Sequence, residues 1–218
     1  MKIALLGATG PSGLQVVKEA LARGHTVTAL VRNPEKLTEK HEKLKVVKAN
    51  IYNADDMAPH FEGQDAVLSC LGTTPSWFSL WTITFYTDTA KPIVEALRKA
   101  NVTRLVFMTS WYTKYDRSDP FIINWVLKPL FLGPTLHNMG QMEDYFDQEC
   151  ADIAYTSVRP PQLVDTDTSG KPVLAEVAQS IRSPGKRFVC CRRDVARFML
   201  DAAEKREYIR KCVAIASG

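Results

Sequence analysis

Short apolar runs alternate along the chain with stretches in which apolar residues recur every three or four positions. Runs of the first kind predict buried strands, and recurrences of the second kind predict helices with one apolar face. The expected strands cover residues 2–6, 26–31, 45–51, 65–72, 104–110, 153–160 and 212–216. Expected helices lie between Gly13 and Gly24, after Asn53, and over 89–101, 138–150 and 193–205.

This alternation of strands and helices predicts an α/β fold, in which parallel strands are joined by right-handed crossovers. We therefore expect a single domain over residues 1–218, built as a doubly wound parallel sheet with helices on both faces and a small helical or loop substrate lobe. In such sheets ligands bind beyond the carboxyl ends of the strands, so motifs at strand ends carry most of the functional information.

Composition narrows the class of protein. The 218 residues are 45% hydrophobic and 24% charged, which is typical of a globular protein, and the net charge of +4 is too small to indicate nucleic-acid binding. No apolar stretch is long enough to predict a membrane span. The five cysteines show no metal-binding spacing, and we expect free thiols, no metal and a reducing, cytoplasmic compartment.

The stretch "GATGPSG" follows the first expected strand and opens the first expected helix. In that setting the spacing of Gly7, Gly10 and Gly13 predicts a loop that binds the pyrophosphate of a dinucleotide. Gly7 permits a tight turn, Gly10 lets the backbone approach the phosphates, and Gly13 lets the helix pack close to the strand. Thr9 and Ser12 add hydroxyl donors at the positive end of the helix.

The end of the second strand indicates which dinucleotide binds. A carboxylate there favours NAD, but this chain has Arg32, with Lys36 four residues later. A guanidinium suits a 2′-phosphate, so we predict NADPH rather than NADH. Asn50 and Ile51, after the third strand, are the expected neighbours of the adenine.

Familiar catalytic pairs are missing. No tyrosine has a lysine four residues later, so proton transfer by a Tyr-x-x-x-Lys pair is not expected, and the sequence contains no GxSxG, HExxH or P-loop motif. A cofactor-bound enzyme without a dedicated proton donor still works when its acceptor needs mainly hydride. Flavins and extended tetrapyrroles are acceptors of that kind.

Several segments together resemble the biliverdin-IXβ reductase/flavin reductase (NADPH) family, within the NmrA-like group of atypical short-chain dehydrogenases/reductases. The segments are "KIALLGATGPSG", "VTALVRNPEKL", "GQDAVLSCLGT", "VTRLVFMTS", "VRPPQLVD" and "RRDVARFML". The resemblance implies a Rossmann NAD(P)-binding fold, a monomer or weak homodimer, and reduction of flavins such as FMN, or of biliverdin, as substrates rather than bound cofactors.

The resemblance also implies roles by position. The pyrophosphate would be held by Gly7, Thr9, Gly10, Pro11, Ser12 and Gly13. Leu71, Gly72 and Thr73 would pass along the cofactor, and Pro160 and Pro161 would line the nicotinamide pocket. Ser110 would stand beside the nicotinamide and the substrate as the catalytic residue.

Four further residues are expected to contact the substrate. Gln162 stands where the family often has histidine, and Arg159 before the prolines is expected to compensate for it. Trp111 is expected in an aromatic wall for a flat ring, with a packed lid or an oligomer surface as the alternative. His137 lies in the expected substrate lobe. Two aromatic segments, 75–86 and 119–137, are insert-like and expected near the substrate.

Two other functions stay open at this stage. The chain could be an NADPH-binding redox sensor of the NmrA type, which binds the cofactor without turnover. It could also reduce or isomerise another small carbonyl or quinone, with Ser110 and His137 sharing proton transfer.

Overall fold

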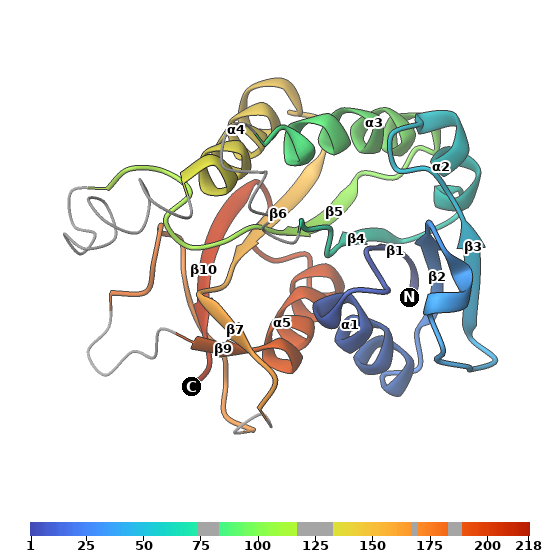
Figure 1. The fold of residues 1–218 in the computed structure, drawn as a ribbon, viewed down its shortest axis with the longest axis horizontal. Coiled ribbons are helices and arrows are strands. Elements are labelled where there is room, and N and C mark those ends of the chain that lie inside the picture. Colours follow the sequence, from blue (N-terminus) through green and yellow to red (C-terminus); the bar gives the residue numbers. More distant parts are fainter. Residues whose placement is uncertain (74–82, 117–132, 167–169, 183–188) are drawn as a thin grey trace.

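Eight strands form one sheet in the computed structural model, which describes residues 1–73, 83–116, 133–166, 170–182 and 189–218 (Figure 1). Their order is β3-β2-β1-β4-β5-β6-β10-β8. The bounds are β1 Lys2–Leu6, β2 Thr26–Val31, β3 Leu44–Lys48, β4 Ala66–Ser69, β5 Arg104–Met108, β6 Ala154–Arg159, β8 Leu174–Glu176 and β10 Lys211–Ala216. Neighbouring strands are parallel, except that β8 is antiparallel to β10. The predicted doubly wound α/β fold is confirmed.

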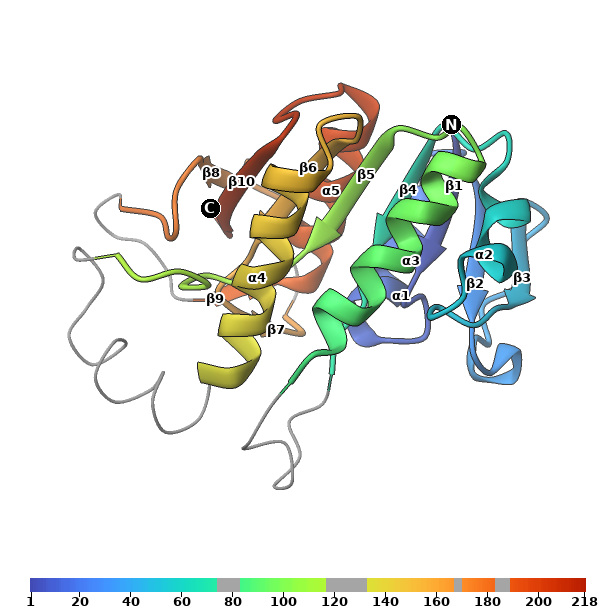
Figure 2. The ribbon, with the colours of Figure 1, turned by 90° about the horizontal axis from the view of Figure 1, so that it is seen from above.

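Helices cover both faces of this sheet. They are α1 Pro11–Ala22, α2 Ala54–Phe61, α3 Phe85–Lys99, α4 Gly133–Glu149 and α5 Arg192–Glu204, with a short 3-10 helix, η1, at Pro34–Lys36. α1 and α5 pack together on one face, and α2, α3 and α4 lie on the other (Figures 1 and 2). The chain is therefore layered as helix, sheet and helix.

The first strand shows why an unbroken apolar run suits this arrangement. Ile3 and Leu5 point into the hydrophobic cluster under α1 and α5, whereas Ala4 and Leu6 point into the cluster under α2, α3 and α4. All four side chains are fully buried. Because successive strand residues face opposite sides, a strand between two helical layers must be apolar at every position.

The switch in strand order lies between β1 and β4. From β1 the chain builds β2 and β3 toward one edge, and from β4 it builds β5 and β6 toward the other. β1 and β4 are hydrogen-bonded neighbours whose following loops diverge, so a crevice opens beyond their carboxyl ends. The glycine loop of residues 7–10 begins there.

Some elements differ from those that the sequence pattern predicts. Three strands of three residues each were not expected: β8, and β7 Gln162–Val164 with β9 Val189–Cys191, which form a small parallel sheet. Such short strands carry too little periodicity to be recognised. α3 begins at Phe85, earlier than the expected helix of residues 89–101, so Pro92 lies inside it. Most of the two aromatic segments, with Trp77, Trp81 and Trp125, lies outside the described residues.

A buried arginine ties the start of β5 to the far end of α5. Arg104 is 1% exposed, and its guanidinium donates to the carbonyl oxygens of Ala154 and Ala202, both at 2.6 Å, and to the Thr156 hydroxyl at 2.9 Å. Burial, helped by the charge of Arg206, lowers the pKa of Arg104 to about 10, so the group stays charged at neutral pH. Backbone carbonyls therefore solvate this cation inside the core.

We expect Arg104→Met to lower the free energy of unfolding by about 3 kcal/mol, because it leaves several buried carbonyl groups without donors. Urea unfolding followed by circular dichroism measures this loss. Arg104→Lys keeps the charge but has fewer donors, and an intermediate loss is expected for it. A methionine variant as stable as the wild type would contradict the structural role assigned to Arg104.

Candidate cofactor-binding site

A cleft of about 310 Å³ opens beyond the carboxyl ends of β1, β2 and β4. It is lined by Gly7, Thr9, Gly10, Leu30, Val31, Arg32, Lys36, Ile51, Cys70, Leu71, Gly72 and Phe85. Eight of these were proposed as cofactor-binding residues from the sequence; Leu30, Val31, Cys70 and Phe85 were not. The cleft therefore gathers, from four separate loops, most of the residues that the sequence assigns to a dinucleotide.

The glycines at the mouth of the cleft differ in what surrounds them. Gly7 has φ +77°, and a Cβ there would lie 2.6 Å from the carbonyl oxygen of Cys70. A Cβ on Gly13 would lie 2.1 Å from the carbonyl oxygen of Gly7. A Cβ on Gly10 would meet only that oxygen, at 3.4 Å. Gly7 and Gly13 thus serve the fold, whereas Gly10 leaves space toward the cleft.

The first helix presents its amino end to this cleft. Gly10 is the N-cap residue of α1, with φ −79° and ψ 160°, and as a glycine it has no side chain with which to cap the helix. Pro11 opens the first turn, which contains no acidic residue. Amide groups at such an end carry a partial positive charge and bind anions. Thr9 is exposed beside them, whereas Ser12 is buried.

Two basic side chains stand on the opposite side of the cleft. Arg32 directly follows β2, and Lys36 ends η1; both are exposed. Neither forms an ion pair with any residue that the structure describes. Both cations are therefore available to an anionic group lying near the end of β2.

The remaining lining is largely apolar. Ile51 is buried, and Phe85 lies edge-on to Tyr52 with ring centroids 6.5 Å apart. Burial raises the pKa of the Cys70 thiol to about 12, so this thiol is protonated at neutral pH. Asn50, predicted beside Ile51, uses its side-chain oxygen to accept a hydrogen bond from the Tyr52 amide at 3.1 Å. An apolar slot of this kind suits a flat aromatic ring.

A residue of α3 contacts the segment that follows β4. The Tyr86 hydroxyl is hydrogen-bonded to Thr73, and burial raises the pKa of this phenol. The Tyr86 amide donates to the Asn138 side chain at 2.9 Å. Thr73 itself does not line the cleft, and its contact with Tyr86 holds the adjacent backbone of Leu71 and Gly72 in place.

A second group of predicted residues lies at the carboxyl ends of β5 and β6. Ser110 is half-buried, while Pro160 and Pro161 are buried. The Trp111 amide donates to the Pro160 carbonyl at 3.0 Å, so these two loops lie side by side. Gln162 and His137 are exposed on β7 and α4, and no hydrogen bond joins His137 to Ser110.

Trp111 differs from the expected aromatic wall. It is 2% exposed and belongs to a hydrophobic cluster with Tyr112, Leu136, Ile181, Ala214 and Ala216. The two alanines of β10 leave room that the indole fills. Trp111 is thus packed inside this cluster rather than lining an open pocket.

Arg159 also differs from expectation. It is 4% exposed, and its guanidinium donates to the Glu143 carboxylate at 2.5 and 2.9 Å and to the Ala178 carbonyl at 3.0 Å. Although burial alone lowers the pKa of an arginine, the bonds to Glu143 raise the pKa of Arg159. Three of its five N–H donors are used within the protein, so an internal ion pair stands where a contact with an acidic substrate was expected.

Glu143 was missed by the sequence reasoning. It sits beside the apolar stripe of α4, and a carboxylate there is 1% exposed only because partners from other elements surround it. The signal that could have found it is Arg159, the one charged residue in an otherwise uncharged strand, because a buried charge requires a partner.

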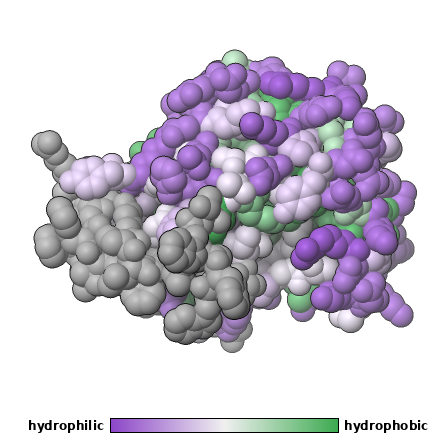
Figure 3. Space-filling view, turned by 45° about the horizontal axis from the view of Figure 1, so that its top comes forward, coloured by the Kyte–Doolittle hydropathy of each residue, from purple (hydrophilic) through white to green (hydrophobic). Residues whose placement is uncertain are grey.

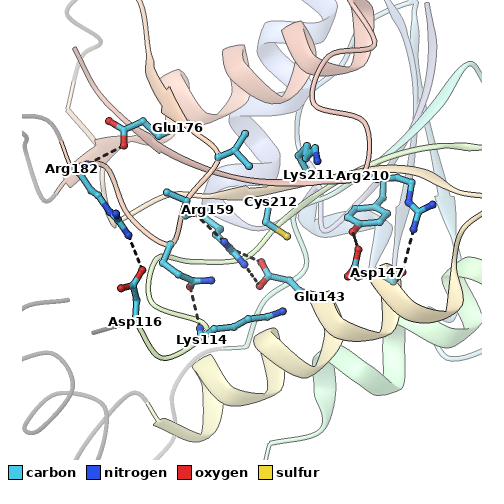
Figure 4. Close-up of a pocket in the computed structure, with 14 residues that line it drawn as sticks. Lys114, Asp116, Glu143, Asp147, Arg159, Glu176, Arg182, Arg210, Lys211 and Cys212 are labelled. Atoms are coloured by element: carbon cyan, nitrogen blue, oxygen red, sulfur yellow. Dashed lines mark hydrogen bonds and ion pairs between the residues drawn. The ribbon is translucent and has the colours of Figure 1, made fainter. Parts of the chain in front are cut away.

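A larger open hollow, of about 630 Å³, lies beside α4 and β10 and contains this pair (Figure 4). Several of its other charged residues are also engaged; for example, Arg182 pairs with Asp116 at 2.8 Å. The described part of the surface in Figure 3 is mostly hydrophilic, and hydrophobic residues show only in limited areas between the hydrophilic ones.

Within the described residues, no cluster of metal-ligating side chains is found. Nor is any described helix both long and apolar enough to span a bilayer.

Comparison with known proteins agrees with this geometry. A family model described as NAD(P)H-binding matches residues 7–206. The uncharacterised protein YwnB of Bacillus subtilis is 32% identical over 170 residues, which cover 76% of this chain and 74% of YwnB.

Two solved structures show the same fold. The oxidoreductase ylbE of Lactococcus lactis aligns with a TM-score of 0.81 at 19% identity, over 100% of this chain and 91% of that one. SP1627 of Streptococcus pneumoniae, a candidate NADH-flavin reductase, aligns over the whole of both chains with a TM-score of 0.78 at 20% identity. At these identities the likeness concerns the fold alone.

Proposed function

The chain belongs to the NAD(P)H-binding family, and on this premise we propose that it is an NADPH-dependent reductase that passes hydride to a flavin or a similar conjugated acceptor. One observation carries the proposal: the cleft joins an uncapped helix end behind a glycine loop to two basic side chains without ion-pair partners among the described residues. This combination suits a pyrophosphate at one end and a 2′-phosphate at the other.

The residues of the cleft divide the binding of NADPH between them. The loop of Gly7 and Gly10 and the amino end of α1 would hold the pyrophosphate, and Arg32 with Lys36 would hold the 2′-phosphate. Ile51 and Phe85 would contact the adenine. The carbonyl oxygen of Gly7 accepts the Gly10 amide at 3.0 Å, which keeps the loop in the shape that leaves this space open.

We expect Arg32→Ala to weaken NADPH binding about tenfold while leaving NADH binding unchanged, because a charge-assisted bond at an exposed site contributes about 1.4 kcal/mol. Lys36→Ala should act in the same direction, with a smaller effect. Fluorescence titration with each cofactor measures both. Lys40→Ala, in the same loop but outside the cleft, is the matched control. Equal losses for NADPH and NADH in the Arg32 variant would contradict the assignment.

The proposed hydride transfer rests on two features: a site for the cofactor, and the lack of a Tyr-x-x-x-Lys proton donor. Bound NADPH supplies hydride, and the protein holds its reactive ring and excludes water. Pro160 and Pro161 would form one wall of that pocket, and Ser110 would stand beside the acceptor. The sequence has no Tyr-x-x-x-Lys pair. An acceptor that takes its proton from solvent, such as a flavin or a tetrapyrrole, fits this lack better than an alcohol or a sugar does.

The experiment that tests this function mixes the purified protein with NADPH under anaerobic conditions and then adds FMN. A decrease in the absorbance of reduced nicotinamide that requires both FMN and the protein supports the reductase. The same assay with NADH in place of NADPH is run in parallel. Biliverdin and quinones are the next acceptors in the same assay.

The missing proton-donor pair also suits a second function, that of an NADPH-binding redox sensor. A sensor binds NADPH tightly and oxidises none of it with any acceptor in the panel. That result would replace the reductase with the sensor, while leaving the cofactor site itself as proposed.

A further inference from the structure

Glu143 is a buried carboxylate with an unusual number of donors. The Thr109 and Ser157 hydroxyls and the Arg159 Nε donate to its Oε1, at 2.8, 2.8 and 2.9 Å. Its Oε2 accepts from the Thr113 hydroxyl at 2.8 Å and from the Arg159 Nη2 at 2.5 Å. Figure 4 shows Glu143 reaching from α4 to Arg159 at the end of β6. One side chain thus joins a helix to two strand ends.

These contacts bracket the segment that carries Ser110. Thr109 lies just before Ser110, and Thr113 lies three residues after it, so Glu143 holds both ends of a five-residue stretch. Within that stretch Tyr112 has φ +63°, a conformation that bulky residues rarely adopt. An outside constraint must keep it there, and the hydroxyl bonds to Glu143 supply one.

The same ion pair reaches the other expected wall of the nicotinamide pocket. Arg159 directly precedes Pro160, whose carbonyl accepts the Trp111 amide at 3.0 Å. Arg159 also donates to the Ala178 carbonyl, and the side-chain oxygen of the next residue, Gln179, accepts from the Lys114 amide at 3.1 Å. The Ser110 loop and the Pro160–Pro161 turn are therefore fixed relative to each other through Glu143.

Stability alone does not account for such a pair. Buried ion pairs contribute little net stability, because removing two charges from water offsets most of their attraction, and apolar residues of similar size often replace them at no loss. An apolar pair cannot accept hydrogen bonds from the hydroxyls of Thr109 and Thr113. The property that distinguishes Glu143 is that these hydrogen bonds orient the loop that carries Ser110.

We propose that Glu143 is a positioning residue, which, through Arg159 and the threonines on either side of Ser110, sets the two loops of the pocket where hydride is transferred. This inference rests on the proposed reductase function. Glu143 touches neither cofactor nor acceptor in this role, and the cleft that holds the phosphates and the adenine is lined by other residues.

Glu143→Gln tests the proposal, because an amide keeps the size but presents one acceptor oxygen and places an NH₂ group against existing donors. We expect kcat for FMN-dependent NADPH oxidation to fall at least tenfold, while the Kd of NADPH stays within twofold of the wild type. Glu149→Gln, the same change at an exposed position of α4, is the matched control and should alter neither quantity.

A double variant separates positioning from folding. Glu143→Met combined with Arg159→Met removes both charges together, so the double variant should still fold, with lower stability than the wild type because buried hydroxyls lose their acceptor, and should bind NADPH, yet lose turnover at least tenfold. Wild-type turnover in both the glutamine and the double variant would overturn the proposal. A double variant that does not fold would also overturn it, because the pair would then hold the fold rather than the pocket.

A readout without turnover keeps this test separate from that of the reductase. If the wild type oxidises no NADPH, the proposed reductase function fails. The fluorescence of bound NADPH then tests whether Glu143 positions the pocket. An ordered nicotinamide pocket enhances that emission. The glutamine variant should bind NADPH with normal affinity but without the wild-type enhancement, and an unchanged enhancement would overturn the positioning role.

Discussion

Replacing Gly10 with aspartate is expected to abolish NADPH binding while leaving the fold intact. Gly10 is the N-cap of α1, with backbone angles that any residue can adopt, and no side chain caps this helix. Aspartate is a preferred N-cap residue, so the stability should stay the same or rise by up to about 1 kcal/mol. Its carboxylate would, however, occupy the place of the pyrophosphate.

The affinity for NADPH should fall at least about hundredfold, because placing the aspartate carboxylate against the negatively charged pyrophosphate costs several kcal/mol. Thermal unfolding and calorimetric titration with NADPH measure the two effects on one preparation. Gly10→Asn has the same size without the charge, and we expect a smaller loss from it. Tight NADPH binding by the aspartate variant would place the pyrophosphate elsewhere than at this helix end.

Replacing Gly13 with alanine should have the opposite consequence, a large loss of stability. Glycine to alanine inside a helix usually stabilises a protein by about 1 kcal/mol. Here the new Cβ would lie 2.1 Å from the carbonyl oxygen of Gly7, in backbone that cannot yield without moving β1 away from α1. We expect a net destabilisation of about 3 kcal/mol or more.

Urea unfolding without cofactor measures this effect, and Gly10→Ala, three residues earlier in the same loop, is the matched control. Its Cβ would meet only the Gly7 oxygen, at 3.4 Å, so its stability should match that of the wild type. Equal stability of the Gly13 variant would show that α1 can shift, and that this glycine is not required for packing.

The contrast between these glycines shows how far local sequence reasoning reaches. The turn at Gly7, the close packing at Gly13 and the positions of Arg32 and Lys36 depend on the chain within a few residues of β1 and β2. Such features follow from a motif placed between a strand and a helix. The parallel arrangement of the central strands likewise follows from their alternation with helices.

Features that depend on distant parts of the chain could not be predicted in this way. Phe85 reaches the cleft because α3 starts earlier than its pattern indicates, and Cys70 because β4 lies against β1. Trp111 is buried because β10, about a hundred residues later, offers two alanines at that point. Glu143 owes its setting to donors from two other segments, the stretch that follows β5 and the end of β6.

The affinity of the unmodified protein for NADPH and for NADH, measured by calorimetric titration in one buffer, is the most direct test of the proposed cofactor site. With Arg32 and Lys36 beside the 2′-phosphate, NADPH should bind at least about tenfold more tightly than NADH. Equal affinities would contradict the assignment of these residues, and failure to bind either dinucleotide would contradict the site as a whole.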